Sequence, residues 1–128
     1  MRTRVVVARA VELPEAEPRL VVHEGVPYCV IKTEGRVSAF VAVCPHKDLA
    51  MVPLRTKHGR IVCPHHGAMF DAASGDVVDD NGKDVPHGLP RVDVTTDEQG
   101  WVCIEARRRH RKLMEKKERQ RVNRVASS

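Results

Sequence analysis

The 128-residue chain is poor in aromatic residues, lacks long apolar runs and holds only four cysteines. Its whole aromatic set is Tyr28, Phe40, Phe70 and Trp101. No apolar stretch approaches the roughly 20 residues that a membrane-spanning helix needs. The apolar run after residues 1–4 is three valines long, which is too short for the core of a secretory signal. We therefore expect a cytoplasmic protein with no membrane partner.

Valine is abundant, with 21 copies, and it favours strands because its branched Cβ packs well on a pleated surface. Short Val-rich segments bounded by Gly, Pro, Asn or Asp predict strands near residues 4–11, 19–23, 28–33, 37–43, 60–62, 69–71, 91–95 and 101–105. Glu24-Gly25 and Glu34-Gly35 are typical hairpin turns, as is the segment 98–100. Strands at this spacing, with no helical pattern between them, predict an all-β sandwich or barrel.

The charge is divided unevenly along the chain. Residues 1–105 carry 12 Lys/Arg and 15 Asp/Glu, whereas residues 106–128 carry 10 Lys/Arg and 2 Glu. We therefore expect a domain of residues 1–105 followed by a basic tail of residues 106–128. The tail contains good helix formers, but like-charge pairs such as Arg108/Lys112 oppose a helix, so it is expected to be a loose helix or a disordered arm.

The basic tail suits either docking to an acidic protein surface or simple solubility. Nucleic acid is not expected as a partner, because no aromatic side chain lies among the charges to stack on bases.

Two short runs each place one thiol beside one imidazole. They are Cys44-Pro45-His46 and Cys63-Pro64-His65-His66-Gly67, and sixteen residues separate Cys-x-His from Cys-x-x-His. Two Cys and two His suit tetrahedral Zn²⁺. They also suit a [2Fe–2S] cluster in which two imidazoles replace two thiolates on one iron. Zinc sites usually pair like residues within a loop, whereas a two-iron cluster needs two mixed loops that face each other, as these runs do.

The residues after the second run make the pattern more specific. Gly67 is followed three positions later by the aromatic Phe70 and then by Gly75. With these elements the chain resembles the Rieske iron–sulfur family over roughly residues 3–105. Residues 86–91 resemble the family's third, proline-containing loop, which shields the cluster. The resemblance implies an antiparallel β-sandwich or barrel with a cluster-binding loop subdomain at about residues 44–75, and one [2Fe–2S] cluster per chain.

The same resemblance assigns the ligands. It implies that Cys44 and Cys63 bind one iron and that His46 and His66 bind the other. His65 stands at a variable position of the family and is expected not to be a ligand. The remaining histidines are expected to be exposed or turn residues, and the remaining cysteines to be small core residues: His23, His58, His87 and His110, and Cys29 and Cys103.

The resemblance also separates branches of the family. Respiratory members hold a disulfide between the two cluster loops, at positions that match Leu49 and His65 here, so it cannot form. They also place serine and tyrosine hydroxyls towards the cluster, where this chain has Ala68 and Phe70. Missing hydroxyl donors imply a potential at the low end of the family range. In these respects the chain resembles the Rieske ferredoxins of bacterial oxygenase systems.

The resemblance therefore implies a one-electron carrier that is not an enzyme on its own. It would pass electrons from a flavin- or iron–sulfur-containing reductase to a terminal oxygenase. The 23-residue tail is too short for the catalytic iron domain of an oxygenase itself. Two alternatives stay open: a small iron–sulfur subunit of a larger redox enzyme, and a redox-sensing or binding module that contains a cluster.

Overall fold

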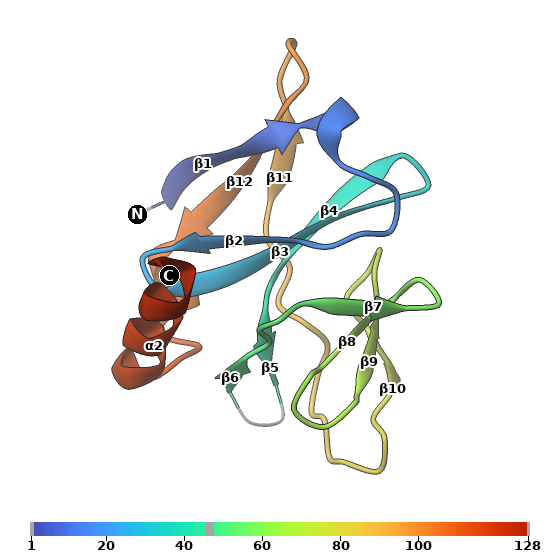
Figure 1. The fold of residues 1–128 in the computed structure, drawn as a ribbon, viewed down its shortest axis with the longest axis vertical. Helices are drawn as coiled ribbons and strands as arrows, with labels where there is room; N and C mark the ends of the chain where they lie inside the picture. The colour runs from blue at the N-terminus through green and yellow to red at the C-terminus, as the bar shows by residue number, and fades with distance from the viewer. Residues whose placement is uncertain (1, 46–47, 128) are drawn as a thin grey trace.

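The computed structural model describes residues 2–45 and 48–127, which form short antiparallel strands and small C-terminal helices (Figure 1). The strands are β1 (Arg2–Arg9), β2 (Arg19–His23), β3 (Val26–Thr33), β4 (Arg36–Val41), β5 (Val43–Cys44), β6 (Leu49–Ala50), β7 (Arg55–Lys57), β8 (Arg60–Val62), β9 (Met69–Asp71), β10 (Val77–Asp79), β11 (Val94–Thr96) and β12 (Trp101–Arg107). The helices are η1 (Ala10–Glu12), α1 (Arg108–Arg111) and α2 (Lys116–Ser127). The predicted all-β fold is confirmed.

The strands form four sheets, with strand orders β1-β12-β11, β2-β3-β4, β5-β6 and β10-β9-β8-β7. The first two sheets pack on one hydrophobic core together with Val43 of β5 and Ala50 of β6, and the small sheet β7–β10 covers a second core that includes Cys44 of β5. Figure 1 shows the small sheet and the β5–β6 hairpin together at the lower end of the molecule.

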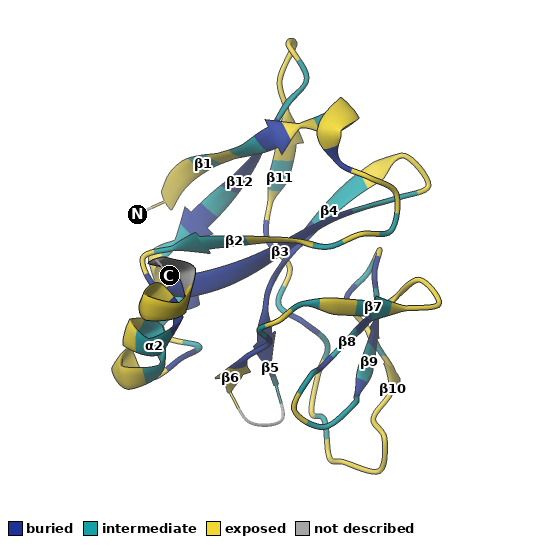
Figure 2. Cartoon of the chain, in the orientation of Figure 1, coloured by how far each residue is buried: buried dark blue, intermediate teal, exposed yellow. Residues whose placement is uncertain are grey.

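β3 separates the two cores. Its side chains alternate, so that Tyr28 and Val30 belong to the core of the main sandwich, while Cys29 and Ile31 belong to the core beneath the small sheet. Residues 26–31 are all buried, and β3 is dark along most of its length in Figure 2. A continuous apolar run is what a strand covered on both faces requires.

Two tight turns set the register of the β2-β3-β4 sheet. Glu24 and Gly25 have φ values of 50° and 78°, and Glu34 and Gly35 have φ values of 51° and 76°. Two successive left-handed residues make the hairpin turn whose twist matches that of the flanking strands. His23 therefore pairs with Val26, and the hairpins expected from the sequence are confirmed.

The basic tail is helical and packs on the body. α2 lies against β2, β3 and β6, and the buried residues Met114 and Val122 join the core of the main sandwich. A Cβ at Gly25 would lie 2.6 Å from the Cβ of Arg119, so α2 sits directly on the β2–β3 turn. Of the two states expected for the tail, the structure has the helix. The division into a domain of residues 1–105 and a tail of residues 106–128 stays a prediction.

The helices of residues 2–45 and 48–127 are short, and the longest, α2, has 12 residues. None of these helices combines the length and the apolar character that a crossing requires.

Candidate metal site

Two loops bring three of the four predicted ligands together. Cys44 ends β5, Cys63 directly follows β8, and His66 lies three residues further along the second loop. Their ligand atoms all lie within 4.8 Å of one another, and His66 Nε2 is 2.7 Å from Cys44 Sγ. His46 lies outside the described residues. Cys44, Cys63 and His66 thus converge as the spacing of the two runs predicts.

Backbone hydrogen bonds shape the second loop around Cys63. Its carbonyl accepts from the amide of Gly67 at 3.0 Å, and its amide donates to the carbonyl of Ala68 at 2.8 Å. Gly67 has a φ of +78°, and a Cβ there would lie 2.9 Å from Nδ2 of Asn81. That Nδ2 donates to the carbonyl of His66 at 2.7 Å. A glycine is therefore needed at position 67 for both its conformation and its lack of a side chain.

The surroundings of Cys63 favour its thiolate. The Cys44 side chain hydrogen-bonds to Cys63 and lowers the pKa of the Cys63 thiol to about 5; burial opposes this shift, and the backbone amides of His65 and His66 add to it. The thiolate is the form that binds metals, so Cys63 is ready to act as a ligand at neutral pH.

The site has one apolar side and one side nearer to solvent. Cys44 and Cys63 are buried in the second core, together with Phe40, Met51 and other apolar residues, whereas His66 is partly exposed. Thiolate and imidazole donors from two mixed loops fit iron in a mixed Cys/His site. Such a site holds its sulfur ligands away from water and leaves a histidine edge close to the surface.

Of His65, His110, Cys29 and Cys103, only His110 departs from expectation. His65 Nε2 donates to the carbonyl of Ala50 at 2.7 Å. His65 is therefore not one of the side chains whose ligand atoms converge. The expectation that His110 is an exposed or turn residue is wrong: it lies in α1, only 3% of it is exposed, and it hydrogen-bonds to Tyr28. Cys29 and Cys103 are buried free thiols, as expected.

Asn81 is a residue of the site that the sequence did not reveal. Its segment, Asp80-Asn81-Gly82, carries a turn signal, but nothing local indicates that the side chain reaches the His66 loop.

Part of the chain is similar in sequence to curated proteins. Apoptosis-inducing factor 3 of mouse (Mus musculus) and of human (Homo sapiens) is 36% identical over 58 residues, which cover 45% of this chain and 10% of those proteins. The matched region therefore spans about a tenth of the length of these curated relatives.

Three solved structures share the fold at below 25% identity. The Sphingomonas yanoikuyae B1 ferredoxin has a TM-score of 0.64 and 24% identity, with 82% of this chain and 100% of that chain covered. A complex of oxygenase and ferredoxin in carbazole 1,9a-dioxygenase has a TM-score of 0.65 and 22% identity, covering 79% and 91%. A putative NADH-dependent nitrite reductase small subunit from Mycobacterium tuberculosis has a TM-score of 0.62 and 15% identity, covering 84% and 97%.

A family model described as the Rieske [2Fe-2S] domain matches residues 3–90, which is more than two thirds of the chain. The match includes both Cys/His runs, and the domain implies a [2Fe–2S] cluster as cofactor and electron transfer as role. The chain therefore belongs to the Rieske [2Fe–2S] domain family.

Proposed function

We propose that this chain is the ferredoxin component of an oxygenase system, with one [2Fe–2S] cluster held by Cys44, His46, Cys63 and His66. It passes single electrons from a flavin- or iron–sulfur-containing reductase to a terminal oxygenase and is not an enzyme on its own. The observation that carries this proposal is the convergence of two buried cysteines and the partly exposed His66 within 4.8 Å, from two mixed loops.

The ligand set suits electron transfer near physiological potentials. Two neutral imidazoles in place of two thiolates reduce the negative charge around a cluster, which raises its potential above that of all-Cys clusters. His66 is partly exposed while both cysteines are buried, so the imidazole side offers the shorter path to a partner.

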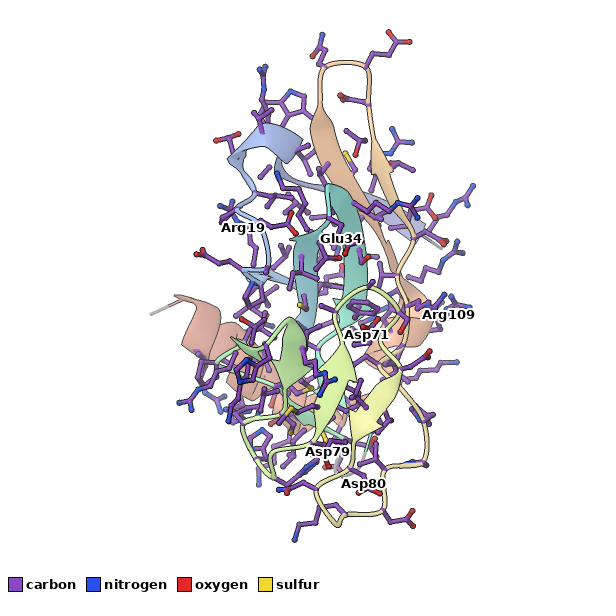
Figure 3. The ribbon with its side chains drawn as sticks, turned by 90° about the vertical axis from the view of Figure 1, so that its right-hand side faces the viewer. Arg19, Glu34, Asp71, Asp79, Asp80 and Arg109 are labelled. Atoms are coloured by element: carbon purple, nitrogen blue, oxygen red, sulfur yellow. The ribbon has the colours of Figure 1, made fainter. Side chains whose placement is uncertain are left out.

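An acidic segment lies beside this imidazole side. Residues 76–84 contain four Asp and one Lys, and Asn81 of the segment binds the His66 carbonyl. Figure 3 shows Asp79 and Asp80 at the lower end of the molecule, with Arg109 well above them. A partner that approaches His66 therefore meets negative charge, and we expect basic residues around its own redox centre. Docking of the basic tail to an acidic surface stays a separate prediction.

The similar structures support the ferredoxin role by precedent. One is a ferredoxin whose whole chain is covered, and another holds an oxygenase together with a ferredoxin. A second candidate function is a small subunit of a larger redox enzyme, which is favoured by the 97% coverage of the putative nitrite reductase small subunit. A cytoplasmic location stays a prediction, and the buried free thiols of Cys29 and Cys103 suit a reducing compartment.

The ligand set is tested by metal and sulfide analysis with electron paramagnetic resonance of anaerobically purified protein. We expect two irons and two sulfides per chain, and loss of both in His46→Ala, Cys63→Ala and His66→Ala. His58→Asn is the control, because His58 is an exposed turn residue with a φ of 52° that asparagine tolerates. One tightly bound zinc per chain in place of iron would contradict the proposal.

The carrier role is tested by stopped-flow transfer from the reduced protein to cytochrome c, a basic one-electron acceptor. One equivalent should transfer per cluster, at a rate that falls as salt rises. Asp79→Asn with Asp80→Asn should slow transfer at low salt, whereas Glu98→Gln, an exposed residue of the β11–β12 turn, should not. Equal rates for all three proteins at low ionic strength would reject the acidic docking face.

A further inference from the structure

Three distant parts of the chain meet at Ala50. Ala50 ends β6, the short strand that pairs with β5 next to Cys44. Its amide donates to Oε2 of Glu118 at 2.9 Å, and its carbonyl accepts from Nε2 of His65 at 2.7 Å. Glu118 belongs to α2, and His65 belongs to the second ligand loop. One residue at the base of the first loop thus contacts both the second loop and the C-terminal helix.

The Glu118 carboxylate is held firmly in this position. Its side chain is only 11% exposed, and the guanidinium of Arg121 binds it through two hydrogen bonds of 2.7 and 2.8 Å. The hydrogen bonds from Arg121 lower the pKa of Glu118, and the amide of Ala50 adds to the shift, so the carboxylate is charged at neutral pH.

Further contacts hold α2 in place and so keep Glu118 next to Ala50. Arg119 Nη1 donates to the carbonyls of Arg111 and Met114 at 2.8 and 2.9 Å, which fixes the connection between the two helices. Val122, one turn beyond Glu118, is buried in the core of the main sandwich.

His65 provides the second contact, with the carbonyl of Ala50. Because a carbonyl only accepts, Nε2 of His65 carries the proton in this hydrogen bond. His65 lies between Cys63 and His66, so the bond ties the second ligand loop to the base of the first.

The β5–β6 hairpin needs such partners. A two-residue ladder is too short to hold its shape alone, and the outer backbone groups of an edge strand otherwise stay unpaired. Ala50 is fully buried, so loss of either partner would leave a buried amide or carbonyl without a hydrogen bond.

We propose that Glu118 and His65 are positioning residues that clamp the two ligand loops together through Ala50, so that α2 controls how tightly the chain keeps its cluster. The proposal rests on the ligand set proposed above. It adds a role for the C-terminal helix: α2 acts on the cluster loops from outside the region that matches the family model.

The test compares full-length holoproteins under an excess of a ferrous chelator, following the visible absorption of the cluster. Glu118→Ala and His65→Ala should each lose the cluster on the order of tenfold faster than wild type. Glu118→Gln keeps an acceptor for Ala50, and His65→Gln keeps a donor at a similar reach, so both should restore slow loss. Glu115→Ala removes the same charge from an exposed position and serves as the control.

A second readout does not depend on the cluster. Amide hydrogen exchange of the peptide covering residues 43–51 should speed up in Glu118→Ala and in His65→Ala, while exchange in β3 stays unchanged. The double alanine variant should lose its cluster little faster than either single variant, because both residues act on one hairpin.

The two proposals fail in different ways. If purified wild-type protein holds no cluster, the proposed function fails. If it holds one and both alanine variants release it at the wild-type rate with unchanged exchange at residues 43–51, the clamp is overturned. Failure of the glutamine variants to restore slow loss would likewise overturn it.

Discussion

The Tyr28 hydroxyl donates a hydrogen bond of 2.9 Å to Nδ1 of His110, which joins the first half of β3 to the first C-terminal helix. The backbone amide of Arg107 donates to the same Nδ1 at 3.1 Å, so the proton of the neutral imidazole lies on Nε2. The rings meet edge-on, with centroids 5.5 Å apart. Burial lowers the pKa of His110 to about 4, and the nearby charges of Arg109 and Arg107 add to the shift, against a smaller opposite effect of Asp93.

The low pKa of His110 predicts a loss of stability in weak acid. The unfolded chain binds a proton near pH 6.5 and the folded chain only near pH 4, so the free energy of unfolding should fall between these values and level off below. The contribution of this group is at most about 3 kcal/mol. Urea unfolding at pH 7, 5.5 and 4.5 measures it, with His110→Gln as the comparison. If the free energy of unfolding fell equally with pH in wild type and His110→Gln, His110 would not be the group responsible.

Replacement of Tyr28 by Phe tests the same contact from the other side. The variant loses one buried hydrogen bond, while His110 keeps the amide of Arg107 as a donor. We expect thermal unfolding to show a loss of about 1 kcal/mol. In a His110→Gln background the same change should cost less, because the partner is already altered. Cluster content should not change, since Tyr28 belongs to the core away from the cysteines.

Gly75 and Gly59 form a matched pair of substitutions. Both have left-handed φ values, +80° and +74°, but a Cβ at Gly75 would lie 2.7 Å from Cε1 of Phe40, whereas a Cβ at Gly59 meets nothing within 4 Å. Gly59→Ala should cost about 1–2 kcal/mol for the backbone alone. Gly75→Ala should cost about 1–3 kcal/mol more through overpacking, and it should lower the iron content because Phe40 shares a core with both cysteines. Similar losses in the two variants would show that Phe40 moves aside freely.

The potential of the cluster should lie near the low end of the Rieske range, about −150 mV. Ala68 and Phe70 are buried beside the site and offer no hydroxyl group. Ala68→Ser should raise the midpoint in a potentiometric titration, because an added donor to sulfur stabilises the reduced state. Ala72→Ser adds the same hydroxyl to the same core beyond β9 and should shift it less. A wild-type midpoint well above zero would mean that other donors, such as backbone amides, replace the hydroxyls.

Several strands, both long and short, were predictable because local signals define them. Strands expected at residues 19–23, 60–62 and 69–71 match β2, β8 and β9, which turn residues bound on both sides. β6, β7 and β10 were not predicted. They are about as short as β8 and β9, but pairing with neighbouring strands, rather than their own composition, makes them strands.

For the site, too, local patterns were predictable and long-range contacts were not. The spacing of the two Cys/His runs was enough to predict that Cys44, Cys63 and His66 lie close together. The contacts of Glu118 with Ala50 and of His110 with Tyr28 bridge 68 and 82 residues. No local pattern encodes such separations, and in a basic tail without a wide apolar stripe neither residue had a reason to be buried.

The pairing of β1 with β12 sets an order of events during synthesis. Arg2 lies opposite Arg107, so the strand made early stays without its partner until the ribosome has passed residue 107, and Glu118 follows later still. Residues 44–66, with their thiols, emerge well before either event. A nascent chain therefore exposes Cys44 and Cys63 before the main sandwich can close, and the proposed clamp at Ala50 forms only after α2 has been made.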